Sequence, residues 1–190
     1  DEGRGGDAGM NFLFNEIGLR CEVALVPDGG SLNEITIEEK GILHLTIKCH
    51  GHSAHAARPW LGDNPIERLV DAVSRLRKDF DSLSKGKGHW HPTCTLTTIK
   101  TPNQTVNCIP SEAEGTLDVR FPAPYTTNEI LNRICNLLGN EIDTHMIMSA
   151  EPTRFTPDPL YLSVSEEITG KSTIQNKEDG GSDARFIGQH

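Results

Sequence analysis

The order of hydrophobic patterns between Gly41 and Ala150 constrains the fold of this chain more than any other feature. Four segments in which apolar and polar residues alternate predict strands, and two with apolar residues three and four positions apart predict helices. The strands are expected over 41–49, 93–100, 112–121 and 144–149, and the helices over 64–83 and 127–138. The order strand, helix, strand, strand, helix, strand is that of the ferredoxin-like βαββαβ unit. We therefore predict an α+β fold for a central domain over 40–150.

The flanking segments 1–39 and 151–190 do not complete an architecture of their own. In the first, apolar spacing predicts a helix that stops at Gly18, followed by a strand over 22–26. The second is expected to form a helix, a loop and another helix. We interpret the two segments as parts of one interrupted domain into which the central domain is inserted, and the whole chain as a piece of a longer protein.

Composition excludes several function classes. The chain has 27 acidic and 18 basic side chains among 190 residues, a net charge of −9, whereas proteins that bind nucleic acids carry a concentrated basic face. No apolar run approaches the roughly 18 residues that span a bilayer. The five cysteines are scattered without a Cys-x-x-Cys pair, which favours a reducing cytoplasm over a disulfide framework or a thiolate zinc site.

Acidic residues in the first segment allow two interpretations. Asp1 or Glu2 could act as a general base on a metal-bound water, or could simply complement the dipole of the following helix. Asp28, at the end of the predicted strand and before two glycines, could ligate a divalent metal or shape a turn.

Three histidines within six residues give the densest signal for chemistry in the central domain. His50, His52 and His55 lie in a loop that has no acidic residue among them. They could hold zinc, one imidazole could polarise a substrate carbonyl, or all three could be ordinary surface residues.

Two further places could bind an anion. Asn107 and Arg120 are expected at neighbouring ends of two strands, where an amide and a guanidinium together can hold a carboxylate, although a loop Asn and an ion-paired Arg would look the same. A glycine-rich turn over 180–185 leads into a helix with Ser182 or Asp183 as its cap, and free amides there can bind an anion.

Taken together, these segments resemble the family of co-catalytic zinc amidohydrolases that includes desuccinylases, deacetylases, aminoacylases and carboxypeptidases. The matching stretches, in order, are 1–9, 27–29, 40–64, 107–110, 118–120 and 180–186. The resemblance implies a catalytic domain with two metal ions, zinc or cobalt, interrupted by a ferredoxin-like lid that also forms a homodimer. It implies hydrolysis of the amide bond of an N-acyl amino acid or peptide by a metal-activated water.

The resemblance also implies a role for each matching residue. Glu2 would be the general base and Asp28 a zinc ligand. His55 would reach a substrate carbonyl, and in a dimer this would be the carbonyl of a substrate bound by the partner subunit. Asn107, Arg120 and Ser182 would bind the substrate.

The chain also departs from the family pattern. The family has two consecutive glutamates where this chain has Glu2 and Gly3, and its other metal ligands would lie outside residues 1–190. We therefore expect this chain alone to be metal-free and inactive. The alternatives are a non-enzymatic dimerisation module and a small binding protein that uses the histidine loop for a metal.

Overall fold

A computed structural model describes residues 7–28 and 30–187, without the side chains of Asp7 and Ala8. Its internal contacts divide the chain into two compact units. The central unit comprises Gly41–Glu151, and the flanking unit comprises Asp1–Lys40 with Pro152–His190. Each unit is described by itself below.

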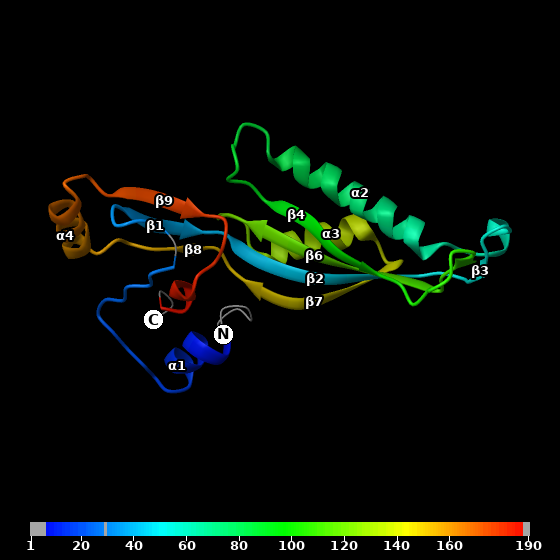
Figure 1. The fold of residues 1–190 in the computed structure, drawn as a ribbon, viewed down its shortest axis with the longest axis horizontal. Coiled ribbons are helices and arrows are strands. Elements are labelled where there is room, and N and C mark those ends of the chain that lie inside the picture. The colour runs from blue at the N-terminus through cyan, green and yellow to red at the C-terminus, as the bar shows by residue number, and fades with distance from the viewer. Residues whose placement is uncertain (1–6, 29, 188–190) are drawn as a thin grey trace. The chain divides into compact units, whose positions relative to one another are not determined.

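The central unit has the ferredoxin-like fold that the sequence predicts. Its antiparallel sheet has the strand order β4-β6-β2-β7, so each crossover passes over one intervening strand (Figure 1). The strands are β2 (Gly41–His50), β4 (Thr93–Lys100), β6 (Glu112–Phe121) and β7 (Ile142–Ala150), and the helices are α2 (Pro65–Leu83) and α3 (Thr127–Leu138). The predicted βαββαβ order is confirmed.

The helices pack on one face of this sheet because β2 and β6 alternate. Leu43, Leu45 and Ile47 on β2 are fully buried against both helices, whereas His44 on the same strand is only half-buried. The opposite face of the sheet, here called the open face, therefore carries the polar residues, as is common in antiparallel sheets.

Side chains at the helix termini explain where the two helices begin. The Asn64 side chain accepts a hydrogen bond from the Ile66 amide, and Pro65 occupies the first helical position. Thr126 and Glu129 form a reciprocal capping box at the start of α3. Gly139, with φ of 74°, ends α3 in a conformation that favours glycine.

The flanking unit is built around a small three-stranded sheet with the order β8-β1-β9. The central strand β1 pairs in parallel with β9 and antiparallel with β8. Its elements are a π-helical turn (Asp7–Asn11), α1 (Phe12–Asn15), β1 (Glu34–Glu39), β8 (Thr153–Arg154), α4 (Pro159–Thr169), β9 (Ile174–Glu178) and a short 3-10 turn (Asp183–Phe186).

Sequence reasoning was less accurate in this unit. The first helix is present, but the strand predicted over 22–26 is irregular chain, in which Val23 and Leu25 are 55% and 70% exposed. A strand needs a neighbour to take its backbone hydrogen bonds, and no described residue pairs with this segment. The loop predicted between two C-terminal helices is strand β9, because it pairs with the unpredicted β1.

None of the described helices is long and apolar enough to cross a membrane.

Truncating a core residue of α3 should destabilise the central unit far more than truncating an exposed isoleucine. Ile134 is fully buried in the cluster beneath the sheet, so Ile134→Ala should cost about 2–5 kcal/mol of unfolding free energy. Ile99 on β4 is 50% exposed, so Ile99→Ala should cost less than about 1 kcal/mol. Urea unfolding measures both, and equal losses would contradict this description of the core.

Candidate functional site

His55 lies in a two-stranded ribbon beyond one end of the central sheet. Strand β3 (Ala54–His55) pairs with β5 (Cys108–Ile109), and His55 stands opposite Cys108. The Ala56 amide donates to the Asn107 carbonyl at 2.9 Å, so the structure brings Asn107, which immediately precedes β5, close to His55 in the ribbon. Both residues are exposed. We call 52–62 with 101–111 the tip.

Two glycines allow the backbone to fold tightly where the tip leaves the sheet. A Cβ on Gly51 would lie 2.3 Å from the Asp63 carbonyl oxygen, and one on Gly62 would lie 2.8 Å from the His52 carbonyl oxygen. The same His52 carbonyl accepts a hydrogen bond from the Asp63 amide. The Asp63 carboxylate in turn accepts a hydrogen bond from Arg68 Nη1 at 2.8 Å. Glycine is therefore required for this close approach.

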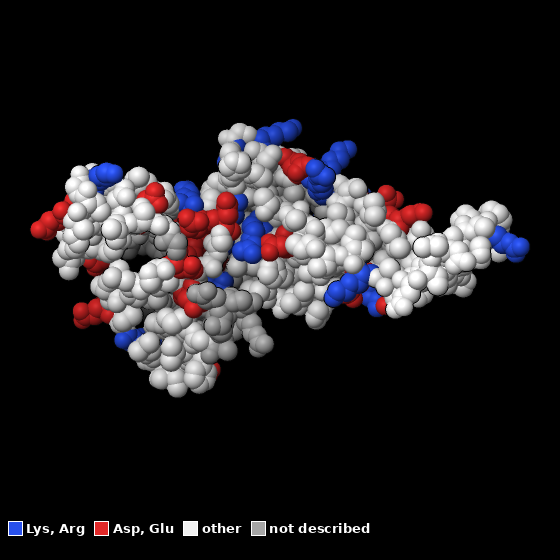
Figure 2. All heavy atoms as spheres, in the orientation of Figure 1, with Lys and Arg blue, Asp and Glu red and all other residues white. Residues whose placement is uncertain are grey.

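The His55 ring has a defined hydrogen-bonding state. Its Nδ1 accepts a hydrogen bond from the Ala57 amide at 3.1 Å, so in the neutral ring the proton is on Nε2. An Nε2–H group is the donor needed to polarise a carbonyl oxygen. The tip around it is almost free of charged side chains on the face shown in Figure 2.

The other histidines of the loop do not join His55. His50 contacts Asp143 on β7 through its Nε2 at 3.0 Å. His52 forms an isolated backbone bridge with Asp63. In the described part of the chain, no group of three or more His, Cys, Asp or Glu is arranged to hold a metal ion.

Arg120 lies on the open face of the sheet in a tight ion pair. Its Nε and Nη2 donate to the two carboxylate oxygens of Asp118, at 2.7 and 3.0 Å, and His44 contacts the second oxygen at 3.0 Å. The three side chains are 27%, 29% and 31% exposed. Hydrogen bonds from Arg120, and to a smaller extent from His44, hold the pKa of Asp118 below its usual value despite its partial burial.

Asn107 and Arg120 do not lie at neighbouring strand ends, so that expectation was wrong. The ribbon joins the sheet at the Glu112 end of β6, where the Gly51 amide donates to the Ser111 carbonyl. Arg120 lies eight residues further along the same strand, which places it about 27 Å away at about 3.4 Å per residue. One subunit therefore cannot bring both residues to one small ligand.

In the flanking unit, Ser182 caps the short 3-10 turn as predicted. Its hydroxyl accepts from the Ala184 amide at 3.2 Å and donates to a carboxylate oxygen of Glu39 at 2.5 Å. Glu39 is 4% exposed, and its other oxygen has no partner among the described residues. This buried carboxylate fixes the direction of the Ser182 hydroxyl.

The remaining two predicted site residues are not part of a described cluster. Asp28 is exposed and follows irregular chain instead of a strand. Glu2 lies outside the described residues.

Sequence reasoning missed His44 and Glu39. Both depend on long-range register: His44 is opposite Asp118 across two strands 74 residues apart, and Glu39 is 143 residues from Ser182. For His44, the signal in the sequence was a polar residue at every second position of the predicted strand 41–49; for Glu39, on the unpredicted β1, there was none.

Substituting Asp118 should give a pH-dependent loss of stability. Because its folded pKa is lowered, its contribution is fully present above the ordinary Asp pKa of about 3.9 and is lost as pH falls through the lower folded value. Asp118→Asn should therefore cost about 1 kcal/mol at pH 7, and this cost should shrink below about pH 4. Urea unfolding from pH 7 to pH 3 measures the difference, and a pH-independent difference would be evidence against the ion pair.

Adding a methyl group at Gly62 should loosen the tip. The new Cβ would lie 2.7 Å from the Ala54 Cβ, so the backbone must shift and the hydrogen bonds between His52 and Asp63 should weaken. Amide hydrogen exchange at Asp63 should become at least about tenfold faster, a loss of 1.4 kcal/mol in local opening free energy. Gly180→Ala is the control, because no atom of the described residues lies within 4 Å of its Cβ position. Unchanged protection in Gly62→Ala would refute the close packing.

Comparison with known proteins identifies relatives of this chain. The peptidase dimerisation domain family matches residues 37–145. A succinyl-diaminopimelate desuccinylase of Wolbachia pipientis wMel is 29% identical over 160 residues, which cover 80% of this chain and 40% of that protein. One of Novosphingobium aromaticivorans is 27% identical over 186 residues, covering 92% of this chain and 48% of that protein. The chain thus spans less than half the length of these curated relatives.

A solved structure shows the same fold. A tripeptidase of Staphylococcus aureus superposes with a TM-score of 0.74 at 16% identity, covering 96% of this chain and 50% of that one.

Proposed function

Because this chain belongs to the peptidase dimerisation domain family, we propose that it is the lid, with flanking parts of the catalytic domain, of a zinc-dependent hydrolase that cleaves amide bonds. We propose an N-acyl amino acid, of the kind a desuccinylase takes, as its substrate. The flanks are 1–39 and 151–190, and the lid is 40–150. All five cysteines are free, which supports a cytoplasmic location.

One observation carries this proposal. The match to a desuccinylase extends over 92% of the chain, well beyond the 37–145 of the dimerisation domain. Both flanks are therefore similar to parts of the same enzyme, which a free-standing dimerisation module would not need. The exposed apolar residues of 17–25 and of α4 are consistent with flanks that pack against further chain.

The described residues do not fit a zinc site. They contain no group of three or more possible ligands, and Asp28 stands exposed. Zinc, when bound by a complete enzyme, supplies an activated water. Glu2 as general base and Asp28 as ligand remain proposals from the resemblance, and we derive no step through the metal.

The lid residues have roles that their own chemistry supports. The Nε2–H of His55 would donate to the substrate carbonyl oxygen as negative charge develops on it. Asn107, which immediately precedes the neighbouring strand β5, would bind the same end of the substrate. Arg120 would hold a substrate carboxylate, and Ser182 would bind the amide or carboxylate from the flanking unit.

The separation within the lid supports a site that is shared by two subunits. A dipeptide-sized substrate spans about 7 Å, far less than the roughly 27 Å between the tip end of β6 and Arg120. We propose that a homodimer solves this problem, with His55 and Asn107 serving the partner's site while Arg120 serves its own.

Charge and edge geometry favour pairing through the lid. The central unit has 11 basic and 12 acidic side chains and so a charge of −1, which leaves −8 of the total −9 for the flanking unit. Two lids can therefore approach with little repulsion. The edge strand β4 is largely exposed and offers unpaired backbone groups to a second copy.

Complementation between two defective subunits tests the proposal. In a full-length enzyme carrying this lid, His55→Ala should lower kcat by about 10²–10³, and Arg120→Ala should also be strongly impaired. When the two variants are co-expressed, half of the dimers are mixed and one of the two sites in each is intact. Activity should then return to about a quarter of the wild-type value.

The matched control is the double variant, His55→Ala with Arg120→Ala, which should restore nothing when co-expressed with either single variant. If the two single variants also fail to complement, the two residues act from the same subunit and the proposed arrangement is wrong.

The 190-residue chain itself should behave as an incomplete enzyme. We expect it to bind less than one equivalent of zinc by elemental mass spectrometry and to release no succinate from an N-succinyl amino acid. Two equivalents of zinc with turnover would contradict this account of the chain.

A further inference from the structure

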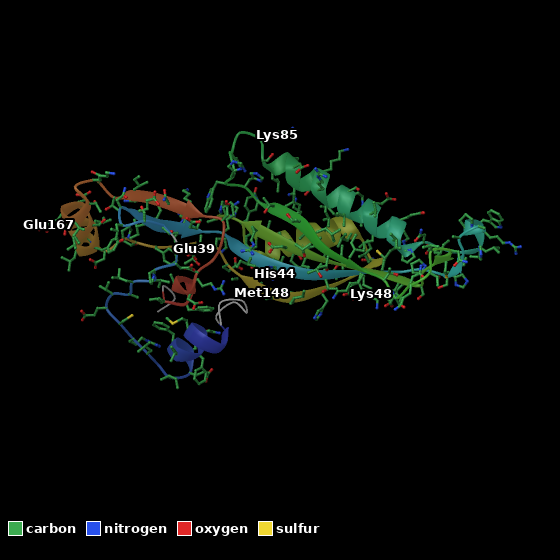
Figure 3. All side chains as sticks on the ribbon, viewed as in Figure 1. Glu39, His44, Lys48, Lys85, Met148 and Glu167 are labelled. Carbon is green, nitrogen blue, oxygen red and sulfur yellow. The ribbon has the colours of Figure 1, made fainter. Side chains whose placement is uncertain are left out.

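The open face of the central sheet joins His44, Asp118 and Arg120 in one chain of hydrogen bonds. We propose that Asp118 and His44 are positioning residues, which hold the Arg120 guanidinium so that its free edge receives a substrate carboxylate. This inference rests on the proposed function of Arg120. Figure 3 labels His44 on β2 and its cross-strand neighbour Met148 on β7. The register places Asp118 of β6 opposite His44 on the other side.

The geometry leaves one edge of the guanidinium available. Asp118 occupies the edge formed by Nε and Nη2, at 2.7 and 3.0 Å. Nη1 and the second hydrogen of Nη2 form the other edge, and no hydrogen bond within the described residues uses Nη1. Two parallel N–H groups on that edge match the two oxygens of a carboxylate.

His44 restrains Asp118 in turn. Its Nε2 contacts the Asp118 oxygen that also accepts from Nη2, and the two residues are directly opposite in the β2–β6 register. Without this contact, the carboxylate could rotate about its side-chain bonds and take the guanidinium with it. The three groups are each about 30% exposed, so water competes only partly for these hydrogen bonds.

Among the described cross-strand neighbours of Arg120, no residue competes with Asp118 for its guanidinium. Its cross-strand neighbours are Ile42 and Thr93, neither of which is charged. The next ion pair on this face, Lys48 with Glu112, lies at the other end of β2. Asp118 therefore sets the orientation of Arg120, and a carboxylate can bind without displacing another acid.

Nuclear magnetic resonance of the 190-residue chain tests the positioning directly. The Arg120 Nε–H group should have a high ¹⁵N order parameter in the wild type and a lower one in Asp118→Asn and His44→Leu. His44→Gln should preserve the order, because its amide can still donate to Asp118. His145→Gln is the matched control, since His145 is an exposed residue opposite Thr46 on the same face. An order parameter that is equal in wild type and His44→Leu would overturn the role of His44. An order parameter that is equal in wild type and Asp118→Asn would overturn the role of Asp118.

A titration with succinate, followed by the shift of the same signal, tests the purpose of the arrangement. Asp118→Asn removes a negative charge, so simple electrostatics predicts tighter binding of the succinate anion, whereas loss of positioning predicts at least fivefold weaker binding. His44→Leu should also weaken binding, and His44→Gln and His145→Gln should leave it unchanged. Tighter binding by Asp118→Asn would overturn the inference.

The two proposals can fail separately. If Arg120 is ordered in the wild type but its signal does not respond to succinate, then the proposed carboxylate role of Arg120 is wrong, and the purpose assigned to its positioning fails with it. If succinate binds equally to wild type, Asp118→Asn and His44→Leu, then Arg120 keeps its role and only the positioning inference is wrong.

Discussion

The burial of one face of strand β2 is the constraint on which the central unit depends. Leu43, Leu45 and Ile47 point into the core and are covered by α2 and α3, while neighbouring strands hold β2 on both sides. A register slip of one residue would turn these side chains to water and His44 into the core. The same alternation that fills the core therefore fixes the polar row on the open face.

This strand also determines where the two proposed functional ends of the lid, the ribbon with His55 and the end with Arg120, lie. At its carboxyl end it leads to Gly51 and the ribbon that carries His55, and at its amino end it lies beside Arg120 through the pair with Ile42. Because β2 is paired with a strand on each side and spans the sheet, its two ends are separated by about the length of a ten-residue strand, roughly 30 Å. The lid is thus suited to serve two places at once, and a dimer is the simplest assembly that uses both.

Local signals predicted the central unit well. The bounds of β4, β6 and α3 are those that alternation and helical spacing predict. The flanking unit was harder to predict because its strands depend on partners that are distant in sequence. Strand β1 has glutamate at three of its six positions, and its partner β9 lies beyond the whole central unit in the sequence. Likewise, the contact between His44 and Asp118 requires a strand register that one sequence does not reveal. The predicted placement of Asn107 near Arg120 was wrong because the sequence did not show that β6 runs away from the ribbon.

The central claim is that His55 and Arg120 of one lid serve different active sites. A crystal structure of a full-length enzyme carrying this lid, with zinc and bound succinate as the product, tests it most directly. The account predicts that the ligand is contacted by Arg120 of one subunit and by His55 of the partner subunit. Contact with both residues of the same subunit, or a monomer with a closed and complete site, would contradict it.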